Sequence, residues 1–285
     1  MVAAAAVDPP AGTGDLRRFL AAVVPTGGAA ALQLATFVLT GRALGPGTFG
    51  LLAVCSAVAA VATDVVGLGG DAAMVRAVVL DRRRRPEAWG HALLLLAASY
   101  PPVAAVAAAV ALALAGPGLG AGTVALLVCG DVLVGRATAA AELAQVALGR
   151  PTAAGCVRLV AAGLRAATAA AVFAGAGAAD PGTWAAAVAA QSALTAALLL
   201  ACAGPARLRL DRPALGFGLL LMLNGVSRSL AANLDRIVLA TLLPGAALGV
   251  YAAGSRLLLF GAIANQAATR ILYCLLYTSD AADEL

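Results

Sequence analysis

Ten ionisable side chains interrupt the long apolar stretches of this sequence, and they are its best candidates for chemistry. A charged side chain at the centre of a bilayer costs roughly 2.5–3.5 kcal/mol unless it faces a cavity or a partner. A simple apolar bundle has no use for so many, so we expect a polar, water-filled interior. The ten are Asp64, Asp131, Arg136, Glu142, Arg158, Arg165, Arg228, Asp235, Arg236 and Arg256.

Spacing groups several of these charges on common helix faces. Arg158 and Arg165 are seven residues apart, which places them on one face about two turns apart. Arginine stays charged when buried and binds phosphate through paired N–H groups. A cavity-facing pair of arginines therefore favours a phosphorylated or otherwise anionic substrate. The alternative is that these arginines pair with Asp131, Glu142 or Asp64, or extend to the membrane interface.

The sequence lacks the residue sets that catalysis or metal binding would require. His91 is the only histidine, and none of the five cysteines forms a CxxC pair. There is no Ser/His/Asp set, no Walker motif and no aspartate-rich metal motif. We therefore expect no catalytic residues, no metal, no cofactor and no enzyme activity.

Composition indicates an all-α polytopic membrane protein. The chain is 62% hydrophobic and only 12% charged, where soluble domains average about 25% charged residues. Mean hydropathy is +0.95. The net charge of +5 comes from arginine without lysine and is not gathered on one soluble face, which argues against a nucleic-acid partner.

Apolar runs predict about eight membrane spans, each near the ~20 residues that a bilayer requires. Residues 1–15 are expected to form a cytoplasmic tail. The predicted helices are 16–41, 49–69, 88–115, 121–148, 153–175, 183–203, 214–243 and 249–273.

Arginine is unevenly distributed between the two sets of loops. One set carries Arg17, Arg18, Arg82 to Arg85, Arg150, Arg207, Arg209 and Arg212, whereas the opposite set carries only Arg42. The positive-inside rule then places the N-terminus and the loops 70–88, 149–153 and 204–213 in the cytoplasm. We expect the Arg82 to Arg85 run to contact anionic membrane lipid.

One phrase occurs twice, about 198 residues apart. Residues 44–56 and 242–255 share Leu, Pro-Gly, Gly, Ala and Ser in step, with one inserted residue. Such recurrence indicates a parallel duplication. We expect a six-helix lobe over 16–203, a cytoplasmic linker over 204–213, and the first two helices of a second lobe over 214–273.

The final residues, 274–285, resemble the translated mosaic-end adapter of transposon-based sequencing libraries. On that interpretation the native sequence continues differently after about Tyr273, and the chain is a truncated form of a longer protein.

The stretches Gly41–Ala53 and Asn233–Arg256 resemble the polysaccharide, or lipid-linked oligosaccharide, flippases of the multidrug/oligosaccharidyl-lipid/polysaccharide exporter superfamily. The resemblance implies two pseudo-symmetric lobes around a central cavity. It also implies alternating access that moves undecaprenyl-diphosphate-linked glycans across the bacterial cytoplasmic membrane. Arginines in the cavity would meet the diphosphate, a role carried onto Arg42, Arg158, Arg165, Arg228 and Arg236. The remaining candidates for charge pairs or ion coupling are Asp64, Asp131, Arg136, Glu142, Asp235 and Arg256.

Two other functions stay open on the sequence. A multidrug/cation antiporter of the same superfamily would require acids in the cavity more than arginines. A non-transporting scaffold of a glycan-assembly complex would have no use for charges inside its spans. Glycosyltransferases or a polymerase of the same pathway are possible partners of either a flippase or a scaffold.

Overall fold

The computed structural model describes residues 13–175, 180–256 and 258, and side chains from Val24 onward. Most of the expected N-terminal tail, the greater part of the predicted helix 249–273 and the whole of 274–285 lie outside the described residues. The helices are α1 (Thr13–Val65), α2 (Gly70–Leu80), η1 (Arg82–Arg84), α3 (Arg85–Ala115), η2 (Gly116–Gly118), α4 (Ala121–Ala147), α5 (Pro151–Gly175), α6 (Pro181–Cys202) and α7 (Arg212–Leu242), and residues 245–256 are also helical.

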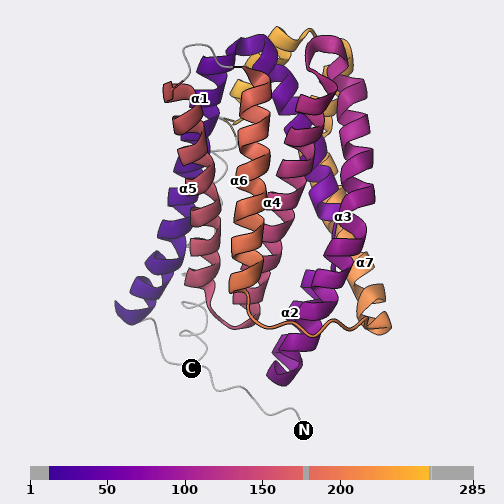
Figure 1. The fold of residues 1–285 in the computed structure, drawn as a ribbon. Helices are drawn as coiled ribbons and strands as arrows, with labels where there is room; N and C mark the ends of the chain where they lie inside the picture. Colours follow the sequence, from indigo (N-terminus) through magenta and orange to yellow (C-terminus); the bar gives the residue numbers. More distant parts are fainter. Residues whose placement is uncertain (1–12, 176–179, 257, 259–285) are drawn as a thin grey trace, which may run out of the picture.

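The described residues form an upright bundle of helices without strands (Figure 1). Six helical segments in this part of the chain are long and apolar enough to cross a membrane. The predicted all-α, polytopic fold is confirmed. The short connections lie at the two ends of the bundle, as expected when the backbone of each span satisfies its own hydrogen bonds in lipid.

α1 is a hairpin of two arms, residues 13–44 and 46–65, because Gly45 breaks it. Gly45 has φ 75° and ψ 165°, a conformation that glycine adopts easily, and Pro46 starts the next helix. The rings of Phe37 and Phe49 pack edge-to-face with centroids 4.6 Å apart. In one straight helix these residues would be about 18 Å apart along the axis. The chain therefore reverses, and the two predicted helices 16–41 and 49–69 are the two arms.

The structure corrects the prediction of a polar loop over residues 70–88. Residues 70–80 form α2, which begins after Gly67, Leu68 and Gly69, all of which have positive φ. Its charges have partners elsewhere in the bundle: Asp71 pairs with Arg136 of α4, and Arg76 lies 4.6 Å from the ring centroid of Phe217 on α7. These tertiary contacts allow a polar segment to be a packed helix.

α4 lies at the centre of the bundle and packs against α1, α2, α3, α5 and α6. Small residues let the neighbouring helices approach closely. A methyl group at Gly130 would lie 3.2 Å from the Ala189 Cα of α6, and one at Gly135 would lie 3.1 Å from the Thr63 hydroxyl of α1. α4 therefore fixes the charged residues that it carries with respect to the rest of the bundle.

The two copies of the repeated phrase touch each other in space. A Cβ on Gly50 would overlap the Gly245 carbonyl oxygen, and a Cβ on Gly249 would overlap the Pro46 carbonyl oxygen. A Cβ on Gly245 would lie 2.9 Å from the carbonyl oxygen of Gly47. Backbone meets backbone in both directions, so glycine is required at these positions of both copies.

Candidate functional site: a charged cavity between the helices

A cavity of about 670 Å³ lies between both arms of α1, α4, α5, α6, α7 and the helix over residues 245–256. It is large enough for a small-molecule site, which typically measures about 300–1,000 Å³. Five charged side chains line it: Asp64, Asp131, Arg165, Arg236 and Arg256. Three arginines outnumber two aspartates, so the cavity favours an anion.

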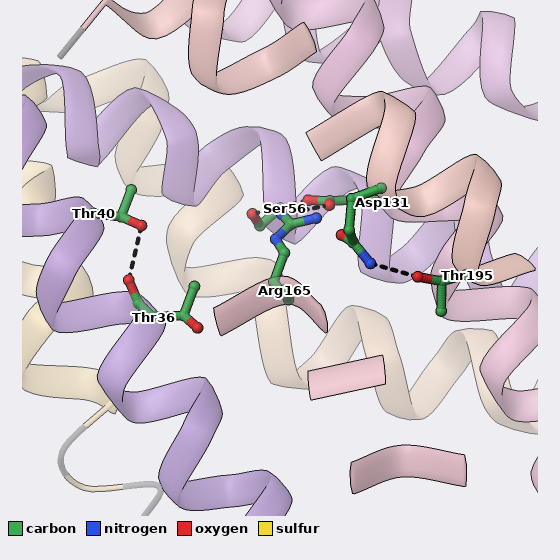
Figure 2. Close-up of polar contacts among 7 residues, drawn as sticks. Thr36, Thr40, Ser56, Asp131, Arg165 and Thr195 are labelled. Atoms are coloured by element: carbon green, nitrogen blue, oxygen red, sulfur yellow. Dashed lines mark hydrogen bonds and ion pairs between the residues drawn. The ribbon is translucent and has the colours of Figure 1, made fainter. Parts of the chain in front are cut away.

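Asp131 of α4 and Arg165 of α5 form an ion pair in the cavity wall (Figure 2). Arg165 donates from Nη2 to Asp131 Oδ1 over 2.8 Å, and Ser56 donates to the other carboxylate oxygen over 3.4 Å. The guanidinium also lies 5.4 Å from the Trp184 ring centroid. The Arg165 and Asp131 side chains are 24% and 19% exposed. Arginine has five N–H donors, so Arg165 keeps donors for a ligand.

Arg236 of α7 lines the same cavity with weaker contacts. It is 8% exposed and donates to Asn233 Oδ1 and Ser255 Oγ, each over 3.4 Å. Its Nε has no hydrogen-bond partner. Arg236 forms no ion pair with any described residue, so it is a buried cation whose donors are incompletely used.

Arg256 completes the set from the helix over residues 245–256. Its guanidinium lies 5.9 Å from the ring centroid of Phe37 on the first arm of α1. Among the described residues Arg256 forms no ion pair with an acid, and Asp64 on the second arm forms none with a base. Of its charges from the described residues, the cavity thus contains one ion pair, two arginines without an ion pair and one aspartate without an ion pair.

The five arginines predicted to bind a diphosphate are divided by the fold. Arg165 and Arg236 line the cavity, whereas Arg42 and Arg228 are exposed away from it. Arg158 forms a two-fold hydrogen bond with Glu142, over 2.9 and 2.6 Å. This is the acid pairing that sequence reasoning considered as the alternative, and it explains why Arg158 and Arg165 differ although they share a helix.

The predicted charge-pair and ion-coupling residues are divided as well. Asp64, Asp131 and Arg256 line the cavity. Arg136 and Glu142 form ion pairs outside it, with Asp71 and Arg158 respectively. Asp235 accepts a 2.6 Å hydrogen bond from the Tyr251 hydroxyl, and its other oxygen is buried without a partner.

Sequence reasoning did not single out the polar stripe of the first α1 arm. Gln33, Thr36 and Thr40 line the cavity. Thr36 donates to the carbonyl of residue 32 over 2.9 Å, and Thr40 donates to the carbonyl of Thr36 over 2.8 Å, the latter shown in Figure 2. Each hydroxyl oxygen therefore retains capacity to accept a hydrogen bond from a ligand. The signal was available, because positions 33, 36 and 40 lie on one helix face.

Metal ligands do not gather in the part of the chain that the structure describes: no three His, Cys, Asp or Glu side chains are placed to hold an ion together. The described cysteines, Cys55, Cys129, Cys156 and Cys202, are free thiols.

The fold and the cavity define a multi-pass helical membrane protein with a charged central cavity. A family model described as polysaccharide biosynthesis protein matches residues 39–276, and the chain belongs to that family. The match includes most of the cavity wall and confirms the resemblance found in the sequence. Comparison with curated proteins and comparison with solved structures each gave no match.

Proposed function

We propose that this protein is a flippase that moves a lipid-linked oligosaccharide, joined to its lipid by a diphosphate, across the bacterial cytoplasmic membrane. The membership of a polysaccharide biosynthesis family gives the process. One observation carries the substrate class: Arg165, Arg236 and Arg256 approach one cavity from three different helices, and two of them form no ion pair with any described residue.

The chemistry of the cavity suits a diphosphate attached to a sugar. Guanidinium groups bind phosphate oxygens through charge-assisted hydrogen bonds. The hydroxyls of Thr36, Thr40 and Ser56 offer neutral hydrogen bonds to a glycan. A volume of about 670 Å³ fits a polar head, while the polyprenyl chain would stay in the surrounding lipid.

Transport would proceed by alternating access, with the N-terminus in the cytoplasm. The diphosphate would compete with Asp131 for Arg165, while Arg236 and Arg256 complete its shell. No reaction of the substrate is required, so the driving force would be an ion gradient or the membrane potential. Asp64 and Asp131 are the candidates for ion coupling, because both acids face the cavity.

The second candidate is a multidrug/cation antiporter. Its supporting observation is Asp64, an acid in the cavity without an ion pair among the described residues, together with the aromatic rings of Phe37, Phe49 and Trp184. An organic cation would use that acid and those rings. The excess of arginine weighs against it.

The test is transport by the whole chain in proteoliposomes. The substrate is a fluorescent polyprenyl-diphosphate disaccharide. A quencher that cannot cross the membrane is added outside, and the fraction of fluorophore that it quenches over time measures movement between the leaflets. Arg236→Ala should reduce the rate at least tenfold. The control is Arg228→Ala, which removes the same charge from the same helix at an exposed position. Equal loss in both variants, or wild-type uptake of an organic cation in place of the diphosphate lipid, would contradict the proposal.

A further inference from the structure

A second pocket of about 290 Å³ lies at the end of the bundle that the arginine distribution assigns to the cytoplasm. We call it the linker pocket, because the segment joining α6 to α7 forms one wall. The other walls are α2 and the first turns of α3. Its polar lining consists of Arg84, Glu87, His91, Arg209, Asp211 and Arg212.

The linker is held on α3 by backbone contacts. The Arg207 N–H donates to the Pro86 carbonyl oxygen over 2.7 Å, and a Cβ on Gly90 would overlap the Arg207 carbonyl oxygen. The Asp211 N–H donates to His91 Nδ1 over 3.2 Å. These contacts fix the position of the linker, so the pocket is a built feature of the fold.

His91 brings an unused donor to this place. Its side chain is 2% exposed, and Nε2 has no hydrogen-bond partner. Because Nδ1 accepts from Asp211, the proton of the neutral imidazole resides on Nε2. A buried donor without an acceptor costs about 1–3 kcal/mol. An acceptor in the pocket would remove that cost.

The other polar groups also favour an anion. The first turns of α3 and α7 both border the pocket, and helix N-termini carry partial positive charge. Arg84 and Arg209 contact acids only at long range, 3.9 Å to Asp211 and 3.6 Å to Glu87, and both arginines are more than half exposed. Their donors can therefore turn to a ligand at small cost.

Apolar side chains beside the pocket indicate where the anion comes from. Val79 and Leu80 at the end of α2 are 70% and 77% exposed, and Leu208 and Leu210 of the linker are also exposed. A free anion in water would not contact these apolar side chains, whereas the acyl chains of a lipid would cover them.

We propose that the linker pocket binds the phosphate group of an anionic phospholipid, with Arg84, Arg209, Arg212 and His91 as its donors. The acyl chains lie along α2 and the linker. A bound lipid stabilises the docked linker between the two parts of the chain. The site is separate from the central cavity and does not depend on the transported substrate.

The test measures binding of phosphatidylglycerol to the whole chain in nanodiscs of neutral phosphatidylcholine, by native mass spectrometry. The double variant Arg84→Ala/Arg209→Ala should weaken binding about tenfold. The matched control is Arg82→Ala/Arg207→Ala, which removes two exposed arginines from the same two segments but outside the pocket lining. Equal weakening in both variants would reduce the effect to general surface charge and overturn the site. No weakening in either would also overturn it.

Two further measurements complete the test. His91→Asn retains an acceptor for the Asp211 N–H but has no donor at the Nε2 position, and it should weaken phosphatidylglycerol binding while the melting temperature in pure phosphatidylcholine stays within a few degrees. Inorganic phosphate, titrated in the same neutral nanodiscs, separates the sources of the anion. Failure of millimolar phosphate to displace the lipid assigns the site to a headgroup; displacement by phosphate supports the anion site but overturns the lipid as its ligand.

Discussion

Two of the ion pairs on α4 lie five residues apart, and they differ in what surrounds them. Asp131 pairs with Arg165 in the wall of the cavity, where the two side chains are 19% and 24% exposed. Arg136 pairs with Asp71 of α2, where they are 8% and 6% exposed and do not line this cavity. The first pair can exchange its partner for a ligand, whereas the second is sealed in protein.

Burial decides what each pair does. Removing one partner of a buried pair leaves an uncompensated charge, which is strongly destabilising. Removing one partner of a pair beside a hydrated cavity destabilises the protein much less, because water replaces the missing partner. The same residue types on the same helix therefore divide into a structural tie between α2 and α4 and a pair at the candidate binding site.

The largest expected effect comes from breaking the sealed pair. Asp71→Ala should lower the free energy of unfolding by about 3–5 kcal/mol, because Arg136 stays buried without a counter-charge. Chemical unfolding in detergent measures it. The double variant Asp71→Ala/Arg136→Leu should recover most of the loss, since an apolar replacement removes the stranded charge. A single variant as stable as wild type would show that water reaches this pair.

The cavity pair should respond in activity and not in stability. Arg165→Ala should slow transport by about tenfold to a hundredfold, equivalent to about 1.4–2.8 kcal/mol, because phosphate loses its two-fold donor. The melting temperature should change by only a few degrees. Arg165→Lys keeps the positive charge but lacks the planar guanidinium with its paired N–H donors. Its transport rate should lie between those of the wild type and Arg165→Ala. A large loss of stability in Arg165→Ala would erase the distinction between the pairs.

A smaller effect sharpens the description of the sealed pair. Gly67 has φ 82°, and a Cβ there would lie 2.9 Å from Arg136 Nε. Gly67→Ala should cost about 1–2 kcal/mol of stability through the left-handed backbone and crowding of the arginine. Gly27→Ala, at a helical glycine with open space around it, is the control and should not destabilise.

The smallest effect is expected at Arg158. Its pair with Glu142 is close, but the arginine side chain is 47% exposed. Arg158→Ala should cost less than about 1 kcal/mol and leave transport unchanged, as measured by unfolding and by the proteoliposome assay. A tenfold loss of transport in Arg158→Ala would contradict this and assign Arg158 to the binding site.

The sequence predicted the helices well and the partners of their charges poorly. Apolar runs located the spans, including the break between the predicted helices 16–41 and 49–69 where α1 turns, because this signal is local. α2 was missed because Asp71 and Arg76 resemble solvent-exposed charges until their partners on α4 and α7 are known. The spacing of Arg158 and Arg165 placed them on one helix, but only the packing shows that Glu142 takes Arg158 and the cavity takes Arg165.

The contact between the two copies of the repeated phrase has a mechanical consequence. Gly47 and Gly50 face Gly245 and Gly249 without an interposed side chain. A second contact of this kind joins the start of α2 to α7, where a Cβ on Gly69 would overlap the Gly218 carbonyl oxygen. Surfaces of this kind have no interlocking knobs, so they can slide past one another without rotamer changes, and parting them exposes little apolar area. The duplicated glycines therefore form a contact between helix backbones, and resistance to sliding at this contact comes from the backbone alone.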